Sequence, residues 1–140
     1  MVTGDTTLHF KTQYGYTALR TFDELKEISQ DILSQYTVFT NQGYKHFGGI
    51  RITHNIPDIL IIEFSDGSNL KCSHSHLILV ENNQFIEAEK LKKGDLMAGF
   101  GLRVKSINLI NNNVYPLYDL ENVEDIQLYY TNRVLSQSIK

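Results

Sequence analysis

The segment that most constrains the fold is a pair of strand-like runs, the second of which contains a polar cluster. Residues 58–65 are rich in β-branched and aromatic side chains, and the run from Asn69 to Val80 has the same character. Asp66-Gly67 between them is the dipeptide that a tight hairpin turn needs. Within the second run stands Ser73-His-Ser-His76, where a strand interior would be apolar. We therefore expect a hairpin strand that ends at this cluster and leaves Ser73 and His76 free to contact something outside the sheet.

The rest of the chain repeats short strand-like runs. Turn-forming Asn, Gly, Asp and Pro residues separate these runs about every ten positions, which is typical of all-β proteins. The additional strands expected on this basis are residues 6–13, 36–39, 47–53, 102–109, 114–123 and 127–135.

One segment has a helical rather than an alternating pattern. Between Thr21 and Ser34, apolar side chains recur at helical spacing, and Glu24 stands three residues after Thr21 as in a capping box. The apolar positions are Phe22, Leu25, Ile28, Ile32 and Leu33. We expect one helix over residues 21–34.

Composition limits the kinds of partner and compartment. The 140 residues, 41% of them hydrophobic, suffice for one domain, and a net charge of -3 from interspersed charges offers no basic face for nucleic acid. No run approaches the roughly 18 apolar residues of a membrane span, and the first residues lack the pattern of a signal peptide. The lone Cys72 cannot form an internal disulfide and fits a reducing compartment. We expect a cytoplasmic monomer that contacts neither membranes nor nucleic acid.

Five short blocks follow one another along the chain. They are Met1-Val-Thr-Gly-Asp-Thr6, Ser73-His-Ser-His76, Leu91-Lys-Lys-Gly-Asp95, Tyr118-Asp-Leu120 and the run from Gln127 to Ser138. In this order they resemble the blocks of inteins, which read nucleophile-x-x-Gly-Asp-Thr, Thr/Ser-x-x-His, Leu-x-x-Gly-Asp, Tyr-Asp-Leu and His-x-Phe-Tyr-Ala-Asn-x-Ile-Leu-x-His-Asn. No block is specific alone, but their order over nearly the whole chain is.

The resemblance implies a fold and an activity. The fold is the all-β HINT (hedgehog/intein) horseshoe with one short helix, and the activity is autocatalytic, single-turnover protein splicing. An acyl shift at residue 1 gives an ester or thioester, transesterification follows, a terminal amide cyclises, and the flanking extein polypeptides are ligated. Residues 1–138 would form one splicing domain, and residues 139–140 would belong to the C-terminal flank.

The length implies an intein without a homing endonuclease. It would be a mini-intein, or the joined halves of a split intein of the phage type, and a split relative would bind a complementary fragment. The Gly-rich stretch Ala98-Gly-Phe-Gly101 is where we expect the split or insertion point. No cofactor or metal is implied.

The resemblance also assigns roles to central residues. Ser73 and His76 would stabilise the tetrahedral intermediate, and His76 would protonate the scissile amide nitrogen as it leaves. Asp119, on a strand expected to pass the same centre, would steer protonation of the nucleophiles.

Met1 and Gln127 depart from the residues that the intein blocks have at these positions. Met1 stands where inteins have Cys or Ser, and its thioether has no proton to lose. Gln127 stands where inteins have His, and an amide cannot carry protons at neutral pH. We therefore expect the chain as written to be inactive at residue 1.

The C-terminal junction allows two registers. Without a gap, Gln137 takes the position of the penultimate His and Ser138 that of the cyclising Asn, so Ile139 begins the flank. With a one-residue deletion, Gln137 becomes the terminal amide and Ser138 the first flanking nucleophile. We prefer the ungapped register. In either register residues 1 and 138 must lie close together, since ligation joins the flanks.

Other functions fit parts of the pattern. A HINT relative that cleaves without ligating would lack the Val134-Leu135 block, and a non-catalytic β binding module would give Ser73 and His76 no special role. A zinc hydrolase would need Cys72, His74 and His76 on one strand face, with a fourth ligand from His46, His54 or Asp119. The order of the five blocks favours the intein.

Overall fold

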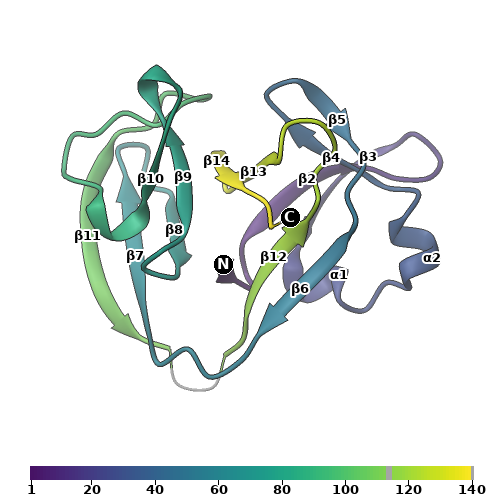
Figure 1. Cartoon of the computed structure of the whole chain (residues 1–140), viewed down its shortest axis with the longest axis horizontal. Helices are drawn as coiled ribbons and strands as arrows, with labels where there is room; N and C mark the ends of the chain where they lie inside the picture. Colours follow the sequence, from purple (N-terminus) through teal and green to yellow (C-terminus); the bar gives the residue numbers. More distant parts are fainter. Residues whose placement is uncertain (113–114, 140) are drawn as a thin grey trace.

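The computed structural model describes residues 1–112 and 115–139, and the largest of its sheets brings together segments from the start, middle and end of the chain (Figure 1). Its antiparallel strands run in the order β11-β7-β8-β1-β12-β6. They are β1 (Val2–Thr3), β6 (Gly49–Thr53), β7 (Asp58–Phe64), β8 (Asn69–Cys72), β11 (Val104–Asn111) and β12 (Leu117–Glu121). Val2 pairs with Cys72 on one side and with Tyr118 on the other, so the first residues are inserted between two hairpins.

Two four-stranded sheets complete the horseshoe. One has the order β3-β2-β4-β5 and the other β10-β9-β14-β13. The first contains β2 (Thr7–Lys11), β3 (Thr17–Thr21), β4 (Thr37–Thr40) and β5 (Gly43–Lys45). The second contains β9 (Leu77–Val80), β10 (Gln84–Glu87), β13 (Leu128–Thr131) and β14 (Val134–Gln137). Figure 1 shows two lobes with both chain ends lying between them.

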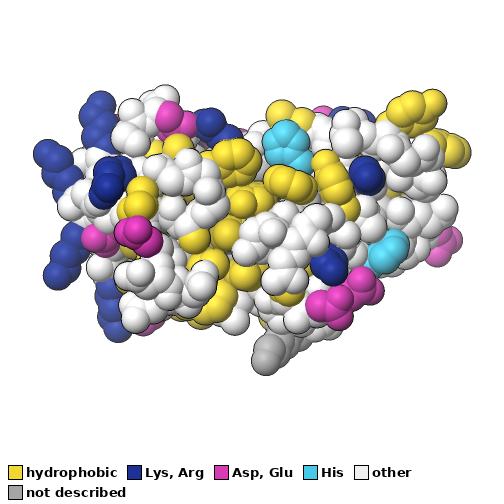
Figure 2. Space-filling model, turned by 90° about the horizontal axis from the view of Figure 1, so that it is seen from above, with side chains coloured by type: hydrophobic (Ala, Val, Ile, Leu, Met, Phe, Trp, Pro, Cys, Tyr) yellow, Lys and Arg dark blue, Asp and Glu magenta, His cyan; other side chains and the backbone are white. Residues whose placement is uncertain are grey.

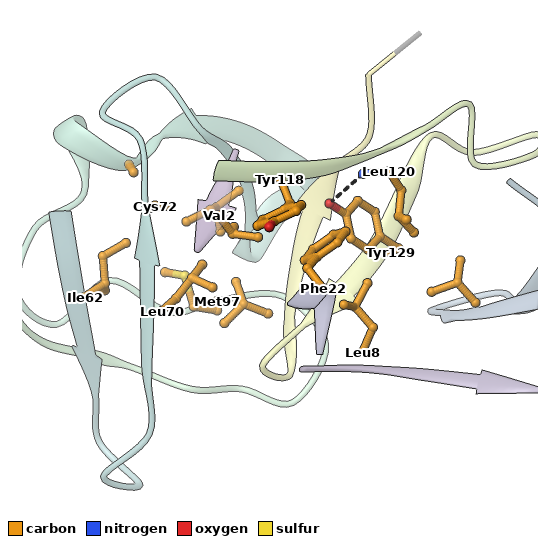
Figure 3. Close-up of a cluster of buried hydrophobic side chains, with 14 of the residues drawn as sticks. Val2, Leu8, Phe22, Ile62, Leu70, Cys72, Met97, Tyr118, Leu120 and Tyr129 are labelled. Atoms are coloured by element: carbon orange, nitrogen blue, oxygen red, sulfur yellow. Dashed lines mark hydrogen bonds between the residues drawn. The ribbon is translucent and has the colours of Figure 1, made fainter. Parts of the chain in front are cut away.

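One hydrophobic cluster runs through both lobes (Figure 3). Val2, Phe22 and Tyr118 are buried at its centre, and the Phe22 and Tyr118 rings stack with centroids 5.4 Å apart. Burying each such side chain contributes roughly 1.5–3 kcal/mol. The start of the chain and β12 are therefore fixed to each other by packing as well as by strand pairing.

A smaller aromatic cluster joins β4 and β13 to the turn at Ala98–Gly101. The ring of Tyr130 stacks on Phe39 with centroids 5.2 Å apart and meets Phe100 edge-on at 5.1 Å. The turn is closed by a hydrogen bond from the Met97 N–H to the Leu102 carbonyl. Figure 2 shows apolar side chains gathered across the middle of the face seen from above.

The expected helix is two short helices. They are α1 (Phe22–Leu25) and α2 (Gln30–Leu33), and the capping box of Thr21 and Glu24 is confirmed. The extended backbone of Ser29 starts the second helix and breaks the continuous pattern, and Ile32 is exposed rather than facing the core. Two single 3-10 turns, η1 (Glu81–Asn83) and η2 (Ala88–Lys90), flank β10. No helix among the described residues is long and apolar enough to cross a membrane.

The strand predictions are confirmed for most segments and wrong for the last one. The hairpin of residues 58–80 forms, but β8 ends at Cys72 and β9 continues in another sheet. Residues 127–135 are not one strand: β13 and β14 form a hairpin that turns at Asn132-Arg133, both with positive φ. The strand expected at 114–123 is β12, and its expected first residue, Val114, lies outside the described residues.

Asn132 ties this last turn to two distant segments. Its Oδ1 accepts hydrogen bonds from the backbone N–H of Thr7 at 2.7 Å and from the Thr7 hydroxyl at 2.9 Å. Its Nδ2 donates to the Asn69 carbonyl at 2.8 Å. Asparagine also tolerates the φ of 45° at this position better than most residues do. The side chain thus holds the C-terminal hairpin against both β2 and β8.

We predict that Asn132→Gly lowers the free energy of unfolding by about 2 kcal/mol, because it keeps the positive φ accessible and removes three partly buried hydrogen bonds. Urea unfolding measures the loss. Asn82→Gly is the matched control, since Asn82 is exposed with φ 74°, and it should change stability by no more than about 0.5 kcal/mol. Equal effects of the two variants would contradict the tie.

Candidate functional site

A polar centre surrounds the backbone nitrogen of residue 1. The Met1 amino group donates to His76 Nδ1 at 2.8 Å and lies 3.6 Å from Asp119 Oδ2. The Met1 carbonyl accepts a hydrogen bond from the Ser73 N–H at 2.9 Å. The pairing of β1 with β8 on one side and β12 on the other brings these groups together, because Ser73 follows β8 and Asp119 lies on β12.

His76 is the buried residue of the turn between β8 and β9. Its N–H donates to the Ser73 carbonyl, and its own carbonyl accepts from the Ala88 N–H. The side chain is only 3% exposed, and its Nε2 contacts the Ser136 hydroxyl at 2.8 Å. Burial, together with the nearby positive amino group, lowers the pKa of His76 well below 6.5. The imidazole is therefore neutral at neutral pH.

Asp119 is a buried carboxyl next to two donors. The Tyr129 hydroxyl donates to its Oδ1 at 2.6 Å, and the Met1 amino group lies near its other oxygen. Burial raises the pKa of Asp119 above its usual 3.8, although the positive amino group and the Tyr129 hydrogen bond oppose that rise. Burial and the adjacent carboxylate raise the pKa of Tyr129 well above 10, so Tyr129 stays a proton donor.

The other end of the chain meets β12 one residue further along. Ser138 is buried, its hydroxyl donates to Gln127 Oε1 at 2.7 Å, and that hydroxyl accepts from the Val123 N–H at 3.3 Å. The Ile139 N–H donates to the Leu120 carbonyl at 3.0 Å. Residue 1 contacts Asp119 and residue 139 contacts Leu120, so both ends lie at one place on β12.

Gln137 stands apart from these contacts. It pairs with Leu128 across the β13–β14 hairpin and is the last residue of β14. Because successive side chains of a strand point to opposite faces, Gln137 faces away from the side that Ser136 occupies. Of the residues singled out in the sequence, the structure thus groups Met1, Ser73, His76 and Asp119, and separately Gln127 and Ser138.

The three residues of the metal alternative do not converge. Cys72 is fully buried, and burial raises the pKa of its thiol to about 12. His74 is partly exposed and lies 3.6 Å from the Glu89 carboxylate, while His76 points into the protein. Because β8 ends at Cys72, the strand alternation that would align the three stops there. Among the described residues, no group of three or more His, Cys, Asp or Glu side chains is placed to hold a metal ion.

Comparison with known proteins identifies relatives by structure. No protein-family model and no curated protein sequence matches the chain. An intein from a hyperthermophile matches with TM-score 0.80 and 14% identity over 98% of both chains, and the VidaL intein with TM-score 0.77 and 19% identity over 98% of this chain and 95% of its own. A consensus engineered intein with an atypical split site is 35% identical, with TM-score 0.63 over 74% of this chain and 82% of its own. This chain belongs to the intein family.

The resemblance and the HINT fold expected from the sequence are confirmed by these matches. Three buried residues of this intein were not anticipated as part of the centre: Tyr129 beside Asp119, and Ser136 and Thr131 beyond His76. Tyr129 could have been found, because it stands at the Phe position of the last block. Ser136 and Thr131 carry no sequence signal, since short hydroxyl side chains in strands are usually exposed.

The neutral state of His76 predicts a pH dependence of stability. The unfolded chain has a normal His pKa near 6.5 and the folded chain a lower one, so the unfolded state binds the proton first as the pH falls. The contribution of neutral His76 to the free energy of unfolding is full above about pH 6.5. It is lost as the pH falls toward the lower pKa of the folded chain, at up to about 1.4 kcal/mol per pH unit.

We predict that the stability advantage of the unaltered chain over His76→Asn shrinks as the pH falls from about 7.5 to about 5, by up to about 2 kcal/mol. Urea unfolding at each pH measures this difference. Because both proteins contain Asp119, the opposite pH effect of Asp119 cancels in the difference. A constant difference for His76→Asn would mean that His76 titrates normally.

Proposed function

We propose that this intein is a protein-splicing domain that retains the acid centre for the first step and lacks the residues that start and finish splicing. The observation that carries the proposal is the 2.8 Å contact between the residue 1 nitrogen and His76 Nδ1, with Asp119 Oδ2 3.6 Å from the same nitrogen. That nitrogen is an amino group here, and it stands in for the scissile amide nitrogen when a polypeptide precedes residue 1. Both groups present an N–H to His76.

The first step makes a specific demand on this centre. A Cys or Ser side chain at residue 1 attacks the preceding carbonyl, an S–C or O–C bond forms, and the C–N bond breaks. The departing nitrogen must take up a proton, or it returns to the carbonyl. In the proposed step, Nδ1 of neutral His76 takes up the proton that the Cys or Ser nucleophile loses and gives it to the departing nitrogen, and the low pKa of His76 makes the protonated ring a strong acid.

Two further contacts support the same role for the centre. The Ser73 N–H holds the Met1 carbonyl, which fixes the peptide plane after the reacting nitrogen. Asp119 has a raised pKa next to that nitrogen, so it can exchange a proton with the nucleophile at a pH closer to neutral than an ordinary carboxyl. In this proposal Ser73 acts through its backbone, and its hydroxyl is secondary.

The residues at positions 1, 127 and 138 are the reason for proposing a splicing-deficient form. Met1 cannot attack a carbonyl, and Ser138 has no amide with which to cyclise. Gln127 Oε1 accepts a hydrogen bond from the Ser138 hydroxyl, but an amide side chain cannot take up that proton and pass it on. The contact of Gln127 with Ser138 rather than with Gln137 favours the ungapped register, in which both occupy the positions of reacting residues. The domain then comprises residues 1–138, and Ile139 begins the flank; Lys140 lies outside the described residues.

The flanking polypeptides are the substrates in this proposal. Both halves of the centre lie within this chain, and in a split form a complementary fragment would supply one of them. A domain that cleaves without ligating would use the same N-terminal centre. Ligation depends on Ser138 and residue 139, so changing those residues separates the two functions.

We predict that the chain placed between two foreign flanks neither splices nor cleaves when thiol is added. Met1→Cys alone should form a thioester, which added dithiothreitol cleaves at residue 1. Met1→Cys with Ser138→Asn and Ile139→Ser should also ligate the flanks. Intact mass spectrometry identifies each product. The pair Ser138→Asn and Ile139→Ser without Met1→Cys is the control and should give no thioester cleavage. Spliced product from the unaltered chain would contradict the proposal.

We predict that, in the flanked Met1→Cys protein, His76→Ala slows thiol-induced cleavage by roughly 100-fold to 10,000-fold, because the leaving nitrogen loses its acid. His74→Ala is the matched control, since His74 is partly exposed and paired with Glu89, and it should leave the rate unchanged. Ser73→Ala should fall close to the control, because the contact with residue 1 uses the backbone N–H. Circular dichroism checks that each variant is folded. If His74→Ala blocks cleavage and His76→Ala does not, the assignment is wrong.

A further inference from the structure

A series of buried hydroxyl groups connects His76 to the C-terminal hairpin. His76 Nε2 lies 2.8 Å from Ser136 Oγ, and Ser136 Oγ lies 2.7 Å from Thr131 Oγ1. The Thr131 hydroxyl donates to the Val134 carbonyl at 3.2 Å. Ser136 and Thr131 are fully buried, so these contacts have no competing solvent.

The direction of each hydrogen bond follows from its end points. A carbonyl only accepts, so the Thr131 proton points to Val134 and the Thr131 oxygen is left to accept from Ser136. The Ser136 oxygen then accepts from His76, which requires a proton on Nε2. At the opposite side of the ring, the residue 1 nitrogen is a donor, which requires a bare Nδ1.

The reverse arrangement fails at two contacts. If the Ser136 proton pointed to Nε2, no proton would remain between the Ser136 and Thr131 oxygens, because the Thr131 proton is committed to Val134. The ring proton would then sit on Nδ1 and face the N–H of residue 1. A buried donor facing a donor, and an acceptor facing an acceptor, are both unfavourable.

We propose that Ser136, supported by Thr131, is a positioning residue that fixes the Nε2–H tautomer of His76 and turns Nδ1 toward the nitrogen of residue 1. The significance of this for splicing rests on the proposed function, in which His76 Nδ1 delivers the proton. Ser136 also pairs with Ile78 and lies two residues before Ser138, so the strand that carries the C-terminal junction orients the acid of the N-terminal junction.

The test is the tautomer itself, measured by ¹⁵N NMR of the His76 ring in the full chain. The natural sequence should give Nδ1 the shift of an unprotonated ring nitrogen and Nε2 that of a protonated one. Ser136→Ala should move both shifts toward a mixture of tautomers, because Nε2–H loses its acceptor. Ser136→Thr keeps the hydroxyl and should restore the natural shifts.

Thr131→Val provides a second route that leaves Ser136 in place. It removes the oxygen that accepts the Ser136 proton, so that proton can turn to Nε2 and the Nδ1–H tautomer gains population. Thr40→Val is the matched control: Thr40 is also a buried hydroxyl, it bonds the Gly43 carbonyl, and its loss should leave the His76 shifts unchanged.

Several results would overturn the proposal. These are an Nδ1–H tautomer in the natural sequence, unchanged His76 shifts in a folded Ser136→Ala or Thr131→Val protein, and an equal shift in Thr40→Val. Thermal unfolding establishes which variants are folded. If neither Ser136→Ala nor Thr131→Val folds, the tautomer of His76 in the unaltered chain alone decides whether the proposal holds.

Cleavage rates separate this inference from the proposed function. In the flanked Met1→Cys protein, Ser136→Ala should slow thiol-induced cleavage on the order of tenfold to a hundredfold, because the acid is misplaced, and Ser136→Thr should recover the rate. If Met1→Cys forms no thioester while the tautomer responds as expected, the proposed function fails and the positioning role stands. If the thioester forms and Ser136→Ala alters neither tautomer nor rate, the positioning role fails alone.

Discussion

The insertion of β1 between β8 and β12 is the constraint on which the centre depends. Val2 is fully buried, pairs with Cys72 on one side and Tyr118 on the other, and joins the core shared by both lobes. Its position fixes the nitrogen of residue 1 between two elements that are distant in sequence. One of these elements contributes His76 and the other Asp119. Without this insertion the two titratable groups would share no partner.

The electrostatics of the centre follow from burial opposed by a few donors. Burial favours the neutral form of both groups, so it lowers the pKa of His76 and raises the pKa of Asp119. The two groups flank a nitrogen that must gain a proton in the first step of splicing, as proposed above. In the same proposal, Met1 and Ser138 affect the reacting atoms and not the strands that hold the centre.

Sequence patterns predicted features that depend on residues close together in the chain, and the order of the intein blocks indicated the fold and part of the centre. The Asp66-Gly67 hairpin and the Thr21 capping box follow from short-range rules, and the intein blocks indicated His76 and Asp119. The turn at Asn132-Arg133 was missed, because its positive φ is supported by hydrogen bonds to Thr7 and Asn69, more than sixty residues away. Ser136 was missed for a similar reason, since its strand pairs at Ile78 with β9, which is distant in the sequence.

A crystal structure of this intein with a short foreign peptide before Met1 tests the central claim most directly. The nitrogen of residue 1 is then the amide that splicing would break. The account predicts that this amide N–H stays within hydrogen-bonding distance, about 3 Å, of His76 Nδ1, that Asp119 stays beside it, and that Ser136 stays on the other side of the ring. An amide displaced from this position, with His76 bonded to a different group, would contradict the account.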